Sequence, residues 1–263
     1  MNIVKSRPEL LVERLNQIAD SLANTGTALA LLGLGSAGKE RDRMDDYSDL
    51  DFFAIVEPGH KSDYLEDFSW LSRVSPVAYY FKNTADGCKW LYDDGVFCEF
   101  AVFEPQELET IPFAEGQVVW AREGFDTEHL LPRSREGRYQ PNPDRDWQLG
   151  EALTNLYVGL GRYCRGERLS AFKFVQHFAL DRLVDLMHLM EHDDSQSMDP
   201  FMPDRRLEAR FIQARERMAR FCQGYEQTPL SALAQLDWLE QNCQVSPFMA
   251  YEIRRLAKAA VRL

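Results

Sequence analysis

The residues best suited to chemistry lie within Gly33–Val56, where the chain reads GLGSAGKERDRMDDYSDLDFFAIV. One apolar stretch ends at Gly35 and Ser36, and Asp49 and Asp51 open a second apolar stretch. Side chains two residues apart on a strand point to the same face, so we expect these two carboxylates to lie close together. Carboxylates held that close repel each other unless a cation neutralises them. Mg²⁺ fits this requirement, since it takes hard oxygen ligands from one or two carboxylates and from substrate phosphates.

The Gly35–Ser36 pair is suited to binding a phosphate at the end of the first apolar stretch. The glycine lets the backbone approach an anion without a Cβ in the way, and the serine offers a hydroxyl. A following helical turn would aim free N–H groups at the same anion. Lys39, Arg41 and Arg43 lie within reach of this loop, although each alone is also consistent with a solvated surface charge. Of the three, we expect Lys39 to bind nucleotide.

A third carboxylate, Glu99, stands in the middle of the apolar stretch Val96–Phe103. Burying a carboxylate among apolar side chains is unfavourable unless it has a partner. Both alternating sets of this stretch are apolar apart from Glu99, which predicts a central strand covered on both faces. Glu99 is therefore a candidate for the same acidic site. The alternatives are a core acid satisfied by other partners and a position at the sheet edge.

Hydrophobic periodicity predicts the elements that must position these residues. A short amphipathic helix is expected between Lys61 and Val74. A stripe of leucines and one isoleucine predicts an earlier, first helix, with a capping box from Ser6 to Glu9 at its start. The stripe is Leu11, Leu15, Ile18 and Leu22. The predicted strands are Thr27–Gly35, Leu50–Val56, Val77–Lys82, Lys89–Asp93 and Val96–Phe103. We therefore expect a mixed sheet of about five strands with helices on one face.

The composition changes at Pro132–Asp146, which has three prolines, a glycine and four arginines. This segment is interpreted as a linker (132–146) between an α/β domain of residues 1–131 and a helical domain of residues 147–263. The later helical signals are a stripe from Phe172 to Met190 and the segments Arg205–Phe221, Leu230–Gln241 and Pro247–Arg262. The predicted fold class is α+β, a mixed sheet with flanking helices followed by an all-helical C-terminal domain.

Composition and charge exclude several classes of protein. The longest apolar run, Ala28–Leu34, is far shorter than the about 18 residues of a membrane span. The five cysteines form no close pair, which excludes a zinc knuckle and fits the reducing conditions of the cytosol. The N-terminal residues lack the pattern of an export leader, which also favours a cytoplasmic protein. Residues 1–140 hold 14 basic and 25 acidic side chains, net −11 of the total −12. This negative charge argues against binding to duplex nucleic acid and would attract a cationic small molecule. The alternative is that the acidic side chains only keep the protein soluble.

The motif Gly35–Ser36 followed by Asp49-Leu50-Asp51 resembles the signature of the nucleotidyltransferase (DNA polymerase beta-like) superfamily. The form DYSDLD at Asp46–Asp51, followed by a helical domain, is most similar to antibiotic-modifying members, namely lincosamide nucleotidyltransferases and aminoglycoside adenylyltransferases. The match covers residues 33–56 and, by its position in a later strand, Glu99.

The resemblance implies Mg²⁺-dependent transfer of a nucleoside monophosphate, AMP being the expected one, from a nucleoside triphosphate to a hydroxyl group, with release of pyrophosphate. By this resemblance Asp49, Asp51 and Glu99 form the catalytic and metal site, and Glu99 also deprotonates the acceptor hydroxyl. Gly35 and Ser36 would contact the β- and γ-phosphates.

Lys173, on the expected first long helix of the C-terminal domain, would by the same resemblance bind the triphosphate; a surface lysine is the alternative. The expected partners are a nucleoside triphosphate, ATP before the others, and a small hydroxylated, cationic acceptor such as a lincosamide or an aminoglycoside. No nucleic acid or membrane partner is expected, and a homodimer is left open. The competing class is a non-catalytic, antitoxin-like module that binds a protein, which the three acids and the long helical domain disfavour.

Overall fold

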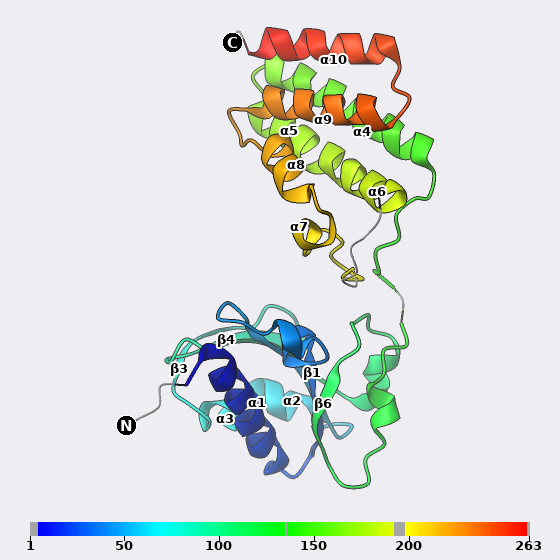
Figure 1. Ribbon diagram of the computed structural model, residues 1–263. Coiled ribbons are helices and arrows are strands. Elements are labelled where there is room, and N and C mark those ends of the chain that lie inside the picture. Colours follow the sequence, from blue (N-terminus) through cyan, green and yellow to red (C-terminus); the bar gives the residue numbers. More distant parts are fainter. Residues whose placement is uncertain (1–4, 135, 192–197, 262–263) are drawn as a thin grey trace. The chain divides into compact units, whose positions relative to one another are not determined.

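A computed structural model describes residues 5–134, 136–191 and 198–261 of the protein. The chain divides into two compact units, residues 1–138 and 139–263. The first contains a mixed sheet with flanking helices and the second is helical, so the predicted α+β class is confirmed (Figure 1). Within the described residues, no helix has the length and apolar character needed to cross a membrane.

The first unit is built on a six-stranded sheet with the strand order β3-β4-β5-β2-β1-β6. β2 and β5 run parallel, and the other neighbouring pairs run antiparallel. The strands are β1 (Ala28–Leu34), β2 (Leu50–Val56), β3 (Val77–Phe81), β4 (Gly87–Tyr92), β5 (Phe97–Phe103) and β6 (Gln117–Ala121). The prediction of about five strands missed β6, an edge strand in which no residue is buried and which therefore carries no core pattern.

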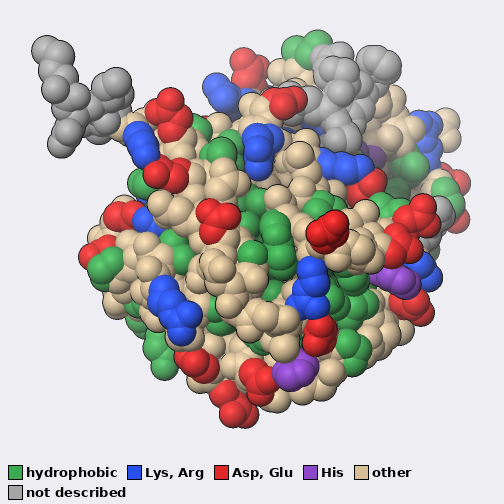
Figure 2. All heavy atoms as spheres, turned by 90° about the horizontal axis from the view of Figure 1, so that it is seen from below, with side chains coloured by type: hydrophobic (Ala, Val, Ile, Leu, Met, Phe, Trp, Pro, Cys, Tyr) green, Lys and Arg blue, Asp and Glu red, His purple; other side chains and the backbone are tan. Residues whose placement is uncertain are grey.

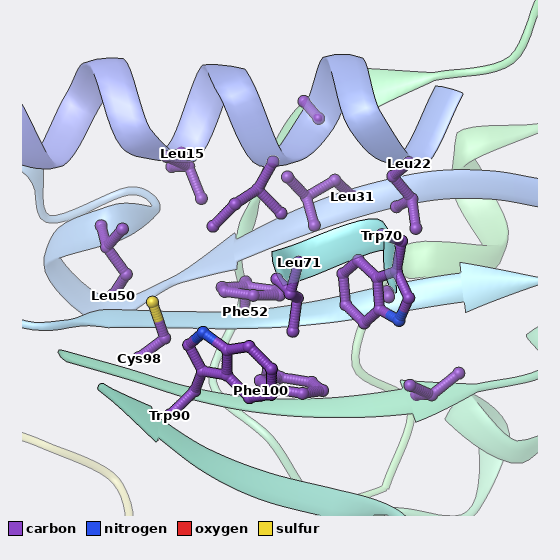
Figure 3. Packing of buried hydrophobic residues seen from close by; sticks show 14 of the residues in the cluster. Leu15, Leu22, Leu31, Leu50, Phe52, Trp70, Leu71, Trp90, Cys98 and Phe100 are labelled. Carbon is purple, nitrogen blue, oxygen red and sulfur yellow. The ribbon is translucent and has the colours of Figure 1, made fainter. Parts of the chain in front are cut away.

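Helix α1 (Arg7–Ala23) covers one face of the sheet (Figure 1). It begins with the predicted capping box: the Ser6 backbone N–H donates to the Glu9 carboxylate at 2.8 Å, and the Glu9 N–H donates to the Ser6 hydroxyl. Figure 3 shows Leu15 and Leu22 pointing from this helix toward the sheet. The predicted stripe is fully buried there: Leu11, Leu15, Ile18 and Leu22. Burial of this stripe is what holds α1 against the sheet.

The helix expected between Lys61 and Val74 is two helices, α2 (Lys61–Glu66) and α3 (Ser69–Ser72). The break falls at Asp67, whose extended backbone ends α2 and whose carboxylate accepts the Ser69 N–H at 2.8 Å. Trp70 of α3 packs edge-on to Phe100 of β5 in the core beneath α1 (Figure 3). Both short helices therefore belong to the same face of the sheet as α1.

The opposite face of the sheet is covered over only part of its area in the described residues. A second apolar cluster packs there, comprising Ala30, Leu32, Ile55, Phe103, Leu108, Phe113 and Leu130. Beyond this cluster the side chain of Glu99 is 43% exposed. The prediction that the strand bearing Glu99 is covered on both faces is therefore wrong: Cys98 and Phe100 are buried under α1 and α3, whereas Glu99 lies on the open side.

The second unit contains helices only among its described elements. They are α4 (Arg145–Cys164), α5 (Arg168–Lys173), a π-helical segment Phe174–Ala179, α6 (Leu180–Met190), α7 (Leu207–Arg210), α8 (Ala214–Phe221), α9 (Thr228–Asn242) and α10 (Pro247–Ala260). The helix predicted over Arg205–Phe221 is divided, because the backbone at Phe211 is extended. Lys173 lies at the end of α5, which continues through the π-helical segment into α6 and so contains the predicted stripe, but this is not the first long helix of the unit, because α4 precedes it.

Candidate functional site

Strand register brings Asp51 and Glu99 to the same place on the sheet. Asp51 of β2 pairs with Glu99 of β5, and Glu99 in turn pairs with Lys89 of β4. Paired residues on neighbouring strands point to the same face, and the strands lie about 4.8 Å apart. Asp51, Glu99 and Lys89 therefore form one row across three strands, on the face opposite α1.

Asp49 lies directly before β2, two residues from Asp51, and both side chains are partly buried. Beneath them, burial raises the pKa of the Cys98 thiol, and the charges of Asp49 and Asp51 raise that pKa further. Both carboxylates therefore lie within electrostatic range of one buried point at this end of β5. That alternation places both side chains on one face stays a prediction.

The loop after β1 stands against these carboxylates. Gly35 has a φ of +50°, in the left-handed region that favours glycine, and its carbonyl accepts the Glu40 N–H at 3.0 Å. A Cβ placed on Gly35 would lie 3.9 Å from Asp51 Oδ2. Ser36, in the short 3-10 turn Gly35–Ala37, is buried, and its contact with a phosphate stays a prediction. The loop thus brings the backbone of Gly35, which has no side chain, next to the carboxylate of Asp51.

The cation beside this loop is Arg43. Its terminal guanidinium nitrogen would be 3.4 Å from a Cβ on Gly35, and its Nε donates to Glu40 at 2.7 Å. Lys39, the lysine expected to bind nucleotide, forms an exposed ion pair with Glu115, just before β6. Arg43 was within sequence reach of the loop, but only the folded turn shows that it stands next to Gly35. The role of Lys39 stays a prediction.

Glu99 has two partners that the sequence did not reveal. Lys89 Nζ lies 3.2 Å from one carboxylate oxygen, and the Asn83 side-chain amide donates to the other oxygen at 3.2 Å. The pair with Lys89 is 41% and 43% exposed, so it contributes about 1 kcal/mol or less to stability. Because β5 is an interior strand and Glu99 is half-exposed, neither alternative for this residue, an edge position or a core acid, describes it.

The expected metal site of Asp49, Asp51 and Glu99 stays a prediction. Among the described residues, no three His, Cys, Asp or Glu side chains are grouped closely enough to hold a metal ion. Asp49 and Asp51 nevertheless offer the hard oxygen donors of a Mg²⁺ site, and Asp51 Oδ2 lies next to the backbone at Gly35. Mg²⁺ is commonly bound by one or two carboxylates with substrate phosphates completing its coordination, and these two residues fit that arrangement. Glu99, the next carboxylate in the row, is paired with Lys89 and Asn83, and its part in a metal site stays a prediction.

The remaining predicted features lie outside this row. Lys173 is exposed on α5 of the second unit, and its contact with a triphosphate stays a prediction. Figure 2 shows one face of the molecule, on which acidic side chains are interspersed with lysines and arginines instead of forming one patch.

Three solved structures are similar to the chain over most of its length. An aminoglycoside 6-adenyltransferase from Bacillus subtilis is 13% identical with a TM-score of 0.33, covering 98% of this chain and 91% of the other. A nucleotidyltransferase-like protein from Exiguobacterium sibiricum 255-15 is 13% identical with a TM-score of 0.31, covering 95% and 75%. A spectinomycin adenyltransferase from Enterococcus faecialis, solved with ATP and spectinomycin, is 12% identical with a TM-score of 0.32, covering 95% and 98%.

All three are nucleotidyltransferases or nucleotidyltransferase-like by name. No protein-family model matches the sequence, and no curated protein matches it. Because TM-scores of this size identify neither a family nor a substrate, we infer function from the residues of the site.

Proposed function

We propose that this protein is a nucleotidyltransferase that transfers a nucleoside monophosphate from a nucleoside triphosphate to a hydroxyl group of a small molecule. The observation that carries the proposal is the pairing of Asp51 with Glu99 on parallel strands, with the left-handed Gly35 loop against Asp51. Phosphoryl-type transfer depends mainly on positioning and electrostatic stabilisation, which such an arrangement supplies.

Each end of the row has a distinct role in the proposal. The backbone at Gly35 and the Arg43 guanidinium bind and orient the triphosphate. Asp49 and Asp51 would hold Mg²⁺, which when bound neutralises charge on the phosphates. Glu99 accepts the proton of the acceptor hydroxyl, as a carboxylate within hydrogen-bond reach can do. The acceptor oxygen then bonds to the α-phosphorus, the bond from this phosphorus to the bridging oxygen breaks, and pyrophosphate leaves with that oxygen.

The substrates we propose are ATP and a lincosamide or aminoglycoside acceptor. The acidic side chains of residues 1–140 support a cationic acceptor, since a net charge of −11 raises the local concentration of cations. The two parts of this proposal are separable, because nucleotidyl transfer depends on the three carboxylates and the Gly35 loop with Arg43, whereas the choice of acceptor depends on the residues around them.

The test is a pyrophosphate-release screen with Mg²⁺. ATP, GTP, CTP and UTP are each paired with lincomycin, clindamycin, spectinomycin, streptomycin and kanamycin. We expect release with ATP and at least one acceptor, abolished by EDTA. A salt series on the active acceptor then tests its charge, because a steered cation shows kcat/KM falling steeply with ionic strength. Absence of release in every pairing would contradict transfer to this class of acceptor.

A further inference from the structure

Aromatic side chains continue the carboxylate row on the open face of the sheet. Phe81 of β3 pairs with Lys89, which pairs with Glu99, which pairs with Asp51, so the row crosses four strands. Tyr79 lies two residues before Phe81 on the same strand. Both are large hydrophobic residues exposed to solvent, with 58% of the surface of Tyr79 and 53% of that of Phe81 accessible.

The neighbouring tyrosine confirms which face these rings occupy. The ring of Tyr80 lies 5.6 Å from that of Phe68 and 5.6 Å from that of Trp90, and both partners pack in or against the core beneath α1. Successive side chains of a strand point to opposite faces. Tyr79 and Phe81 therefore point to the other face, which is the face of Lys89 and Glu99.

Partly buried apolar side chains extend this surface in the next row. Tyr79 pairs with Leu91 of β4, and Leu91 pairs with Phe97 of β5. We call these side chains the aromatic platform; its members are Tyr79, Phe81, Leu91 and Phe97. Phe81 lies two strand spacings from Glu99, about 10 Å, which is the length of a molecule with two rings.

We propose that the aromatic platform is the surface on which the acceptor lies, an inference that rests on the proposed nucleotidyl transfer. Small-molecule sites combine an apolar, aromatic lining with a few placed polar groups, and here the polar groups are Glu99 and its partners Lys89 and Asn83. The acceptor places its reacting hydroxyl at Glu99 and an apolar ring face on Tyr79 and Phe81.

The positive charge of Lys89 next to the platform restricts which acceptor groups can lie over it. In the part of the chain that the structure describes, the one basic side chain in the row is Lys89, and Glu99 already neutralises it. An ammonium group on the platform side would lie next to Lys89, whose like charge repels it. The acceptor is therefore a hydroxylated molecule of at least two rings whose ring over the platform is uncharged, with any amine directed away from it.

The test compares the Tyr79→Ala/Phe81→Ala double variant with Tyr80→Ala. Tyr80 is a matched control, since it lies on the same strand with 55% exposure but points to the opposite face. With the acceptor found in the pyrophosphate screen, we expect the double variant to raise the acceptor KM by about tenfold while the KM for ATP stays unchanged. Tyr80→Ala should leave both constants near their original values.

Calorimetric titration of lincomycin and spectinomycin without nucleotide separates this inference from the proposed function. If the protein is inactive with every acceptor, nucleotidyl transfer to them is refuted, and weaker binding to the double variant alone still supports the platform. An unchanged acceptor KM in a folded double variant overturns the inference, as does equal binding or no binding in the titration. A dimer that dissociates in the double variant also overturns it, because a second copy of the chain would then occupy the platform.

Discussion

Asp51 on β2 and Glu99 on β5 lie opposite each other across a pair of parallel strands. The parallel direction matters because both strands start at the same edge of the sheet, where the Gly35 loop also ends. A carboxylate near the start of each strand is thereby brought beside the bare backbone of one loop. In the proposed function, this relationship makes phosphate binding and proton transfer parts of one site.

Replacing Asp51 with Asn tests the metal-binding end of the row. The substitution keeps the shape of the side chain and removes a charge, so we expect Mg²⁺-dependent turnover to fall by about 10³-fold. The thermal midpoint should hold or rise, since repulsion between Asp49 and Asp51 is relieved. The measurement is kcat together with Tm by calorimetry. Asp20→Asn, an exposed acid on α1, is the charge-matched control and should turn over normally.

Replacing Glu99 with Gln tests the proton-accepting end. An amide cannot take the acceptor's proton, so we expect kcat to fall by about 10²- to 10⁴-fold while the KM for ATP is retained. Steady-state kinetics with each substrate varied in turn measures both constants. Glu66→Gln, at the exposed end of α2, serves as the control. Equal kcat in the Glu99→Gln variant and the parent protein would remove Glu99 from the chemistry.

Gly33→Ala tests how tightly the loop after β1 is packed. A Cβ on Gly33 would lie 2.3 Å from the Ala37 carbonyl oxygen, so backbone must shift, and we expect a loss of about 3 kcal/mol in the free energy of unfolding. Gly26→Ala is the comparison in the same unit. Gly26 has a φ of +86° but nothing within 4 Å of the new methyl group, so strain alone should remove about 1 kcal/mol. Urea unfolding measures both, and equal losses would contradict the packing argument.

Asp181 on α6 predicts a pH-dependent stability in the second unit. Although the residue is exposed overall, partial desolvation raises the pKa of its carboxyl, Asp185 and Asp204 raise it further, and His177 and Arg182 oppose the shift. Because the folded pKa lies above the unfolded value of 3.8, its stabilising effect is complete below that pH and is lost as pH rises through the folded pKa.

Asp181→Asn should therefore raise the thermal midpoint slightly at pH 7, because solvent screens an exposed carboxyl, with the difference from the parent protein shrinking as the pH approaches 3.8. Calorimetric scans across this pH range give the comparison. Glu151→Gln, an exposed acid on α4, should show no such trend. A midpoint difference that is constant with pH would show that the effect is not due to titration.

The sequence by itself determined the features whose cause is local. The capping box at Ser6 and the buried stripe of α1 depend on contacts within a few residues, and both are as predicted. Strand alternation likewise predicts that Asp49 and Asp51 share one face. The helix expected over Lys61–Val74 shows where local reasoning failed, because the Asp67 side chain competes for backbone N–H groups and ends the helix.

Only the tertiary structure decided which strands are neighbours and in what register. Lys89 and Asn83 became the partners of Glu99, and Phe81 was placed in its row, through pairings between segments separated along the chain. A shift of register by one residue would turn each of these side chains to the other face. The periodicity within one strand does not specify its register with its neighbours. For the same reason the apolar pattern around Glu99 predicted a covered strand, although the second apolar cluster stops short of it.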